Sequence, residues 1–353
     1  MDTKLCDILI VGSGPAGSSA AIAASRGGLR VLVVETRKVI GRPVRCAEYI
    51  PAPLVREVKL GHDFIVQAAN KMRTILPDGE VQETRAPGYI INRDIFDQGL
   101  ARKAEERGAE IWLSSKAVSI DKEGIEVHRK DGIQKVKAKF IIGADGPHTK
   151  VGSWINSTNR NLIPSAQMSF ELSAPMENTE VYFDKEIYGG YGWLFPKGDT
   201  ANVGIGLQKS NDKSESISKV LDHFVLRLKE EGKIKGDPLR KTAGWIPAEQ
   251  PRRIIKDNIL LAGDAAGHTH PITGAGVAQA VICGKMAGKW AANAVEADDL
   301  SILEEYEKEW CELYEESLTR AFNRRQLLER EWDNLENIVK RCWIVFREYY
   351  AEP

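Results

Sequence analysis

The feature that most constrains the fold is a glycine-rich turn between an apolar strand and a helix of small residues. Residues 7–11, DILIV, have the composition of a buried parallel strand, and they run straight into GSGPAG at 12–17, a GxGxxG pattern. A second apolar segment, GGLRVLVVE at 27–35, ends in Glu35. This order predicts a βαβ unit with a dinucleotide diphosphate at the N–H groups that open its helix.

Each small residue of the turn has a physical role in such a unit. Gly12 permits the tight turn, Gly14 lets a diphosphate approach the backbone, and Gly17 allows the helix to pack closely on the strand. Ala16 lies in the same turn, so we include it among the cofactor contacts. Glu35 is placed to accept hydrogen bonds from the ribose hydroxyls, and its charge disfavours NADP at this site. The pattern alone does not separate NAD from FAD.

Two later segments favour FAD. KFIIGADG (139–146) and NILLAGDAAG (258–267) both read as buried strands that end beside an acidic residue, and a long helix opens soon after the second. FAD has a ribityl chain whose hydroxyls need an acceptor, and its reduced pyrimidine ring needs positive potential, which a helix N-terminus supplies. Ordinary NAD dehydrogenases need neither. The residues expected to contact FAD in these segments are Asp145, Gly263, Asp264, Gly274, Gly276 and Val277.

The GxGxxG turn, the Asp145-Gly146 pair and the Gly263-Asp264 pair are three sequence fingerprints. In this order they resemble those of the flavoprotein monooxygenase superfamily with the p-hydroxybenzoate hydroxylase fold. The resemblance implies an α/β, two-lobed chain: a Rossmann-type FAD-binding domain, an inserted antiparallel-sheet substrate domain and a C-terminal helical region. It also implies that Arg93, at the start of a helix, binds the FAD diphosphate, and that Ala117 and Val118 meet the adenine. Thr149 stands where the family usually has Ser.

The loop GRPVRCAEYI (41–50) is similar to that of the geranylgeranyl reductase branch of this superfamily. The resemblance places Cys46 and Ala47 against the isoalloxazine, and we include Arg45 of the same loop among the cofactor contacts. Cys46 is our candidate catalytic residue, because a small thiol beside a flavin can act as a weak acid. The competing interpretation is that Cys46 is only a small buried side chain.

The stretch YGWLFPKGDTANVGIG (191–206) resembles the YxWxFP…GxG signature of the same branch, which lies in the substrate domain beside the apolar tunnel for a prenyl chain. Aromatic residues at alternate positions share one face of a strand. They form either the wall of an apolar site or ordinary sheet core. Flavin-dependent halogenases carry a related WxWxIP motif and an early lysine, for which Lys71 is available here. The residues expected to contact substrate are Tyr191, Trp193, Phe195, Pro196, Gly204 and Gly206.

We therefore predict an FAD-dependent oxidoreductase acting on CH–CH groups. It would hydrogenate isolated C=C bonds of geranylgeranyl or polyprenyl chains, with hydride from N5 of reduced flavin and a proton from Cys46, Tyr191, His268 or water. The substrate would be a prenyl-chain lipid or a prenyl diphosphate, and the electron donor NAD(P)H, ferredoxin or another carrier. The alternatives are a flavin monooxygenase or halogenase acting on an apolar small molecule, and a non-redox lipid-binding flavoprotein.

The predicted domain organisation is discontinuous. Residues 1–50, 88–155 and 250–295 would form the FAD-binding domain, and residues 51–87 and 156–249 the substrate domain. Residues 296–353 carry apolar side chains at helical spacing and would form two or three packed helices.

Composition excludes several other classes. The formal net charge of −1 gives no electrostatic basis for binding nucleic acid. The 5 cysteines include no CxxC pair, so we expect neither a metal site nor a disulfide scaffold, and a reducing cytoplasm is the default location. No apolar segment is long enough to span a membrane. The C-terminal CWIVFREYY (342–350) suits either core packing or transient contact with a membrane surface, so the protein could be peripheral to the membrane.

Overall fold

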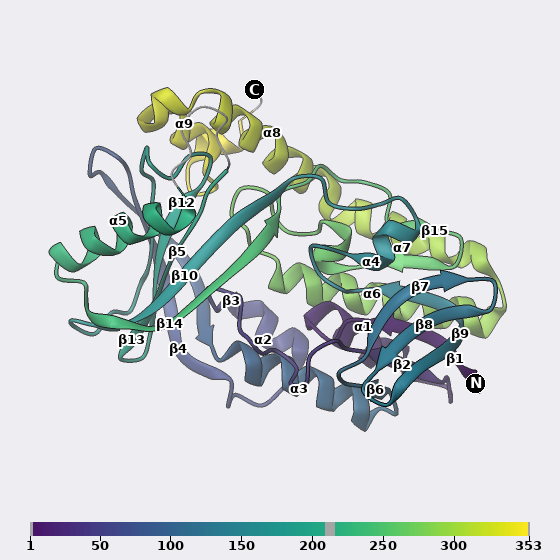
Figure 1. Ribbon diagram of the computed structural model, residues 1–353. Coiled ribbons are helices and arrows are strands. Elements are labelled where there is room, and N and C mark those ends of the chain that lie inside the picture. The colour runs from purple at the N-terminus through teal and green to yellow at the C-terminus, as the bar shows by residue number, and fades with distance from the viewer. Residues whose placement is uncertain (1–2, 209–215, 352–353) are drawn as a thin grey trace.

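The computed structural model describes residues 3–208 and 216–351, and its chain forms two lobes with helices laid across both (Figure 1). Within the described residues, the first sheet has eight strands, with β9, β1 and β2 parallel at its centre. In chain order its strands are β1 (Lys4–Val11), β2 (Val31–Val34), β6 (Glu110–Trp112), β7 (Lys116–Asp121), β8 (Gly124–Arg129), β9 (Gly132–Gly143), β15 (Ile255–Lys256) and β16 (Ile259–Leu261).

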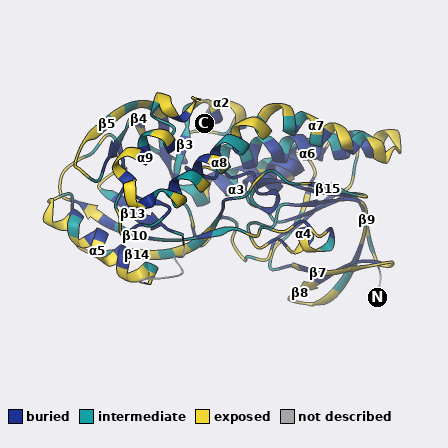
Figure 2. Ribbon diagram, turned by 90° about the horizontal axis from the view of Figure 1, so that it is seen from above, coloured by how far each residue is buried: buried dark blue, intermediate teal, exposed yellow. Residues whose placement is uncertain are grey.

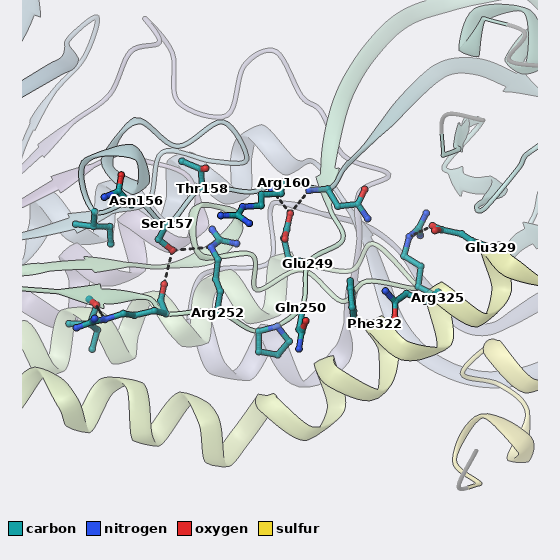
Figure 3. Close-up of a pocket in the computed structure, with 16 residues that line it drawn as sticks. Asn156, Ser157, Thr158, Arg160, Glu249, Gln250, Arg252, Phe322, Arg325 and Glu329 are labelled. Carbon is teal, nitrogen blue, oxygen red and sulfur yellow. Dashed lines mark hydrogen bonds and ion pairs between the residues drawn. The ribbon is translucent and has the colours of Figure 1, made fainter. Parts of the chain in front are cut away.

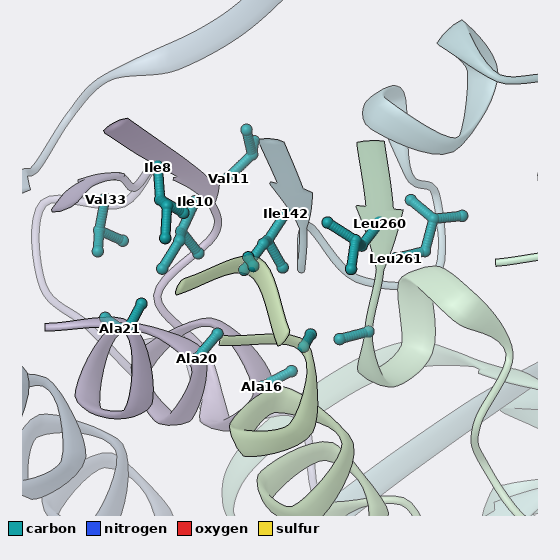
Figure 4. Close-up of a cluster of buried hydrophobic side chains, with 14 of the residues drawn as sticks. Ile8, Ile10, Val11, Ala16, Ala20, Ala21, Val33, Ile142, Leu260 and Leu261 are labelled. Atoms are coloured by element: carbon teal, nitrogen blue, oxygen red, sulfur yellow. The ribbon is translucent and has the colours of Figure 1, made fainter. Parts of the chain in front are cut away.

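Helices of small residues pack on this sheet. Ala20 and Ala21 of the first helix, residues 15–24, pack on its apolar face, which includes Ile8, Ile10 and Ile142 (Figure 4). A longer helix crosses the first helix closely, because Gly284 and Gly288 lie against its backbone where a Cβ would clash. The helices of this lobe are α1 (Pro15–Ala24), α2 (Ala52–Val58), α3 (Arg93–Glu106), α4 (Lys150–Trp154), the 3-10 turn η1 (Gly263–Ala266) and α6 (Val277–Ala297).

The second sheet also has eight strands within the described residues, in the order β14-β10-β13-β12-β11-β4-β5-β3. One face is covered by α5 (Ile217–Glu230), whose Phe224 and Leu228 are buried. All neighbouring pairs are antiparallel except β11 with β4, which run parallel. The strands are β3 (Tyr49–Pro51), β4 (Ile65–Ile75), β5 (Val81–Ile91), β10 (Leu162–Leu172), β11 (Thr179–Tyr182), β12 (Tyr191–Lys197), β13 (Thr200–Gly206) and β14 (Ile234–Pro247).

The C-terminal region is helical and covers parts of both lobes (Figures 1 and 2). Most of its apolar residues are buried, as helical spacing predicts, but Leu313 is 57% exposed. Leu313 lies in a π-helical turn, which adds a residue to the local helix and rotates this side chain off the buried face. The elements are η2 (Leu300–Leu303), α7 (Glu304–Trp310), the π-turn η3 (Cys311–Glu315), α8 (Glu316–Arg330), η4 (Trp332–Asn334), α9 (Leu335–Cys342) and η5 (Arg347–Tyr349).

The fold class predicted from the sequence is confirmed, with one parallel strand pair in the second sheet that the sequence did not indicate. The domain boundaries remain predictions, and residues 1–2, 209–215 and 352–353 of those ranges lie outside the described residues. No helix of the described chain has both the length and the hydropathy that a bilayer-spanning segment needs.

Candidate active site

The glycine-rich turn has the geometry that a diphosphate site needs. Gly12 adopts φ +100°, and a Cβ there would collide with the carbonyl oxygen of Ala144. A Cβ on Gly17 would collide with the backbone of Gly12, so α1 can approach β1 only with glycine at this position. By contrast, a Cβ on Gly14 would meet no atom within 4 Å. The space beside Gly14, at the start of α1, is therefore open to a ligand.

Glu35 ends β2 with a largely buried carboxylate. It accepts hydrogen bonds from the backbone N–H groups of Ser13, at 2.8 Å, and Arg37, at 2.9 Å, so the acid is held beside the glycine-rich turn. The backbone of Ser115 donates to the Glu35 carbonyl at 2.8 Å, which brings the start of β7 to the same edge. In β7, Ala117 is buried, and Val118 occupies a bulge against β8. The predicted ribose and adenine contacts are thus close together.

Asp264 faces the start of α6. Its Oδ1 accepts a hydrogen bond from the Thr269 hydroxyl at 2.8 Å, and no described residue donates to its Oδ2. A Cβ on Gly276, the residue that caps α6, would lie 3.3 Å from Oδ1, so the carboxylate adjoins the helix N-terminus. Burial raises the pKa of Asp264, partly offset by the Thr269 hydrogen bond. A free acceptor oxygen beside free helix N–H groups suits a ribityl hydroxyl and the flavin pyrimidine.

The neighbouring predicted contacts are small or adopt special backbone conformations. Gly263 (φ +64°) lies so close to Ala16 that a Cβ would be 2.8 Å from the Ala16 methyl group. Gly274 (φ +63°) turns the chain between His270 and α6, and Val277 is the first residue of that helix. The segment of Gly263 and Asp264, which we call the GD segment, therefore lies beside both the glycine-rich turn and the start of α6.

The Asp145 carboxylate mainly accepts hydrogen bonds from the residues that open α4. It accepts hydrogen bonds from the Thr149 hydroxyl and the Lys150 N–H, both at 2.6 Å, and from the Val151 N–H at 3.1 Å. These bonds satisfy the free donors at the start of α4. Thr149 in turn accepts from the Gly152 N–H at 2.8 Å, so the threonine performs the capping role that serine would perform.

Arg93 lies among three groups of the site. Its side chain is 16% exposed and pairs with Asp97 at 2.7 Å, and it is close enough to Cys46 and Asp264 to interact with both electrostatically. Burial opposes the charge of Arg93, but Asp97 and Cys46 outweigh it and raise its pKa. Arg93 is therefore a fixed cation between the Cys46 loop and Asp264.

The Cys46 loop is held against the second sheet. The Cys46 sulfur accepts a hydrogen bond from the Glu48 N–H at 3.2 Å, while Arg45 is exposed and lies beside Gly244 of β14. The Glu48 side chain, 1% exposed, accepts hydrogen bonds from Lys197 at 2.7 Å and Asn202 at 2.9 Å. Asn202 also donates to the carbonyl of Ala47 at 3.3 Å. This loop thus rests on the β12–β13 hairpin.

The aromatic segment is a regular strand paired with glycines. β12 and β13 pair without a bulge, with Tyr191 opposite Gly206 and Trp193 opposite Gly204. A Cβ on Gly204 would clash with the Trp193 indole, so glycine makes room for the ring. The two halves of the YxWxFP…GxG signature therefore meet across the hairpin. Phe195 packs edge-on against Tyr49 of β3, and Pro196 points to the opposite, buried face.

A hydrogen-bonded chain links this aromatic face to the Cys46 loop. The Trp193 indole N–H donates to Gln167 Oε1 at 3.0 Å, and Gln167 Nε2 donates to the Cys46 carbonyl at 3.2 Å. Tyr191 donates from its hydroxyl to the carbonyl of Thr273, which precedes α6. The sequence patterns did not indicate Gln167, Asn202 or Glu48. An amide side chain within an apolar strand, as at Gln167 and Asn202, is a signal that could have indicated these two residues.

The histidines before α6 are buried and neutral. Burial lowers the pKa of His268 to about 3 and that of His270 to about 4. His268 stacks on Trp310 with ring centroids 5.1 Å apart, and neither of its ring nitrogens has a partner among the described residues. His270 Nδ1 accepts from the Thr273 N–H at 3.3 Å. Neither residue is therefore placed as a ready proton donor near neutral pH.

Comparison with known proteins agrees with this arrangement. The family model of the FAD binding domain matches residues 5–320. Digeranylgeranylglycerophospholipid reductase 1 of Methanopyrus kandleri is 36% identical over 341 residues, which cover 89% of this chain and 88% of that protein.

Solved structures show the same fold. A geranylgeranyl bacteriochlorophyll reductase-like protein from Thermoplasma acidophilum superposes with a TM-score of 0.88 at 29% identity, covering 99% of this chain and 94% of that one. A flavin-dependent brominase superposes with a TM-score of 0.73 at 20% identity, covering 96% and 90%, which shows a common fold alone. The matched domain and the reductase relatives together establish that this chain belongs to the digeranylgeranylglycerophospholipid reductase family of FAD-dependent oxidoreductases.

Proposed function

We propose that this protein hydrogenates isolated C=C bonds in the geranylgeranyl chains of an isoprenoid phospholipid. The names of its relatives support this substrate class. The observation that carries the proposal is the connection between the aromatic face of β12 and the Cys46 loop, through Trp193 and Gln167. An uncharged aromatic wall beside a flavin is suited to an alkene that has no polar group to bind.

FAD fits the residues around the glycine-rich turn, because the space at Gly14, the Glu35 carboxylate, the free oxygen of Asp264 and the start of α6 correspond to its diphosphate, ribose, ribityl and pyrimidine parts. When bound and reduced, it supplies the hydride. The residues that we propose to hold it are Gly12, Gly14, Ala16, Gly17, Glu35, Arg45, Cys46, Ala47, Arg93, Ala117, Val118, Asp145, Gly263, Asp264, Gly274, Gly276 and Val277.

The chain's own residues would position the alkene and supply the proton. Tyr191, Trp193 and Phe195 would exclude water and hold the prenyl chain against the flavin, because reduction of an unactivated bond depends on close approach in a dry site. Pro196, Gly204 and Gly206 would shape the same hairpin.

Cys46 is the proton donor that we favour. Its sulfur can hold a proton, and the Arg93 guanidinium and the Glu48 N–H beside it would stabilise the thiolate that remains. Tyr191 is less suited, because burial raises the pKa of its hydroxyl and that hydroxyl is bonded to the Thr273 carbonyl.

The proposal also includes an electron donor and a way for the lipid to reach the protein. We propose NAD(P)H, ferredoxin or another carrier as the donor, docking transiently. A geranylgeranyl lipid resides in a membrane, so we also propose that the protein contacts the membrane surface without spanning it. Trp343 and Tyr349 of the C-terminal aromatic segment are buried, which argues for core packing there rather than a membrane anchor.

The test is to incubate the dithionite-reduced holoprotein with a geranylgeranyl phospholipid and to measure the product by mass spectrometry. We expect a gain of two hydrogens for each double bond. In a parallel incubation with NADPH, O2 and a halide salt, a gain of oxygen or halogen would instead indicate the monooxygenase or halogenase alternative. Lys71, the lysine that a halogenase would need, is paired with Glu83 at 2.9 Å on exposed strands. Unchanged lipid across a range of prenyl chains would contradict the proposal.

A further inference from the structure

A polar cavity of about 540 Å³ lies outside the predicted flavin contacts (Figure 3). Its walls are two of the segments that connect the lobes, 155–161 and 249–255, and α8, which contributes Phe322, Arg325 and Glu329 (Figure 3). None of the residues that we assign to FAD lines it. Four arginines line it against two glutamates: Arg160, Arg252, Arg253 and Arg325 against Glu249 and Glu329.

Three of these arginines have no carboxylate partner among the described residues. Arg252 is half-buried and donates only to neutral oxygens, those of Ser157 at 3.0 Å, Asn159 at 2.7 Å and Ala265 at 2.7 Å. Arg253 donates from Nε to the carbonyl of Ile255. The Arg160 side chain makes no hydrogen bond or ion pair within the described chain, so its donors are available to a ligand.

Neither glutamate forms an ion pair with Arg160, Arg252 or Arg253 in the described chain. Glu249 accepts hydrogen bonds from the backbone N–H groups of Arg160 and Asn161, and therefore fixes the loop that carries Arg160. Glu329 pairs with Arg325 at 2.8 Å. The cavity thus keeps an excess of positive charge, which suits an anion with several acceptor oxygens.

The cavity adjoins both the predicted flavin site and the aromatic face. Arg252 donates a hydrogen bond to the Ala265 carbonyl, and Asn159 donates one to the Asp264 carbonyl at 2.9 Å. One wall of the cavity is therefore bonded to the GD segment. Arg325 also lines a small apolar pocket formed by residues such as Tyr191, Ile272 and Trp343. Its guanidinium donates to the carbonyls of Pro271 and Gly189. A polar space and an apolar one therefore share this buried side chain.

We propose that the cavity binds the phosphate-bearing head of the lipid substrate, with Arg160 and Arg253 as the charged contacts, while the prenyl chain runs toward Tyr191. The inference rests on the proposed function. The polar cavity has room for a phosphate-bearing head, whereas the apolar pocket beside Tyr191 holds only about 10 Å³, so the prenyl chain must displace side chains that fill it. A nicotinamide dinucleotide carries the same phosphate chemistry, and the test distinguishes the two sources.

The experiment measures dissociation constants of the FAD-loaded protein for geranylgeranyl monophosphate, geranylgeraniol and NADPH, by quenching of tryptophan fluorescence. Wild type should bind the monophosphate more tightly than the alcohol. In the double variant Arg160→Gln, Arg253→Gln, the monophosphate constant should rise about tenfold, because two solvent-exposed ionic contacts are lost. The ratio of monophosphate to alcohol affinity should fall by the same factor. Arg102→Gln, which removes an exposed arginine of α3, is the matched control and should leave both constants unchanged.

Three outcomes would overturn the assignment. Equal weakening of the alcohol and the monophosphate would mean that these arginines do not recognise the phosphate. Loss of NADPH affinity alone would assign the cavity to the electron donor, and unchanged constants for all three ligands would exclude a phosphate site. Binding is read without turnover, so a wild-type protein that binds the monophosphate but reduces no lipid would refute the proposed function and leave the head-group site standing.

Discussion

At the residue scale, the two acids of the fingerprints have different surroundings. Asp145 accepts three hydrogen bonds from the start of α4, whereas Asp264 Oδ2 accepts none from the described residues. We predict that Asp264→Ala loses FAD on dilution, because a ribityl hydroxyl loses its acceptor. Asp145→Ala should mainly lower stability, by about 1 kcal/mol for the lost cap. Flavin absorbance after gel filtration and melting temperature measure the two effects. Full flavin occupancy in Asp264→Ala would contradict the assignment.

Trp193 is the residue that best separates a site wall from ordinary core. It is 7% exposed, and its indole bonds Gln167, which holds the Cys46 carbonyl. We predict that Trp193→Ala retains FAD and that its loss of activity grows with the number of isoprene units in the substrate. Relative rates on a short and a long prenyl substrate, with the melting temperature, test this. A purely structural role predicts a stability loss of about 3–5 kcal/mol and equal rate losses on both substrates.

At the element scale, the hairpin of β12 and β13 depends on which glycine faces which ring. A Cβ on Gly204 would clash with the Trp193 indole, while the nearest atom to a Cβ on Gly206 would be 3.8 Å away. We predict that Gly204→Ala destabilises the protein by about 1–3 kcal/mol, through overpacking. Gly206→Ala, on the same strand and face, is the matched control and should change stability little. Urea unfolding of both variants measures this, and equal losses would refute the explanation.

The same elements show how far the sequence predicts the structure. The glycine-rich turn was predictable because strand, turn and helix are consecutive, so local spacing contains the whole motif. The pairing of Trp193 with Gly204 was not, because strand register depends on both strands together. The link from Gln167 to Cys46 joins residues 121 positions apart, and no local pattern contains it. The exposure of Leu313 was not predictable, because helical spacing assumes a regular helix, which the π-turn interrupts.

At the scale of the whole molecule, the segment between Asp264 and α6 is held from several directions. Tyr191 of the second lobe bonds Thr273, Arg325 of α8 bonds Pro271, and Tyr349 near the C-terminus lies 3.4 Å from His270. The position of the proposed flavin contacts thus depends on both lobes and on the C-terminal helices. A substitution of a buried residue in this segment, such as His268, should therefore change the free energy of unfolding of the whole protein.

The effect of His268 on the free energy of unfolding can be tested by changing the pH. Its pKa is about 3 in the folded protein, lowered by burial, against about 6.5 when unfolded. Between these values the unfolded chain binds the extra proton, so this residue's contribution favours unfolding increasingly as pH falls below about 6.5. Replacing it with phenylalanine, which preserves the stack on Trp310, should remove this penalty.

The difference in unfolding free energy, His268→Phe minus wild type, should therefore rise by about 2 kcal/mol from pH 7.5 to pH 5. Buried acids such as Asp264 have raised pKa values and act in the opposite direction, but they are common to both proteins and cancel in the difference. His62→Phe, at an exposed position, is the control and should give a difference that does not change with pH. A pH-independent difference for His268→Phe as well would mean that this imidazole is charged or solvated in the folded protein.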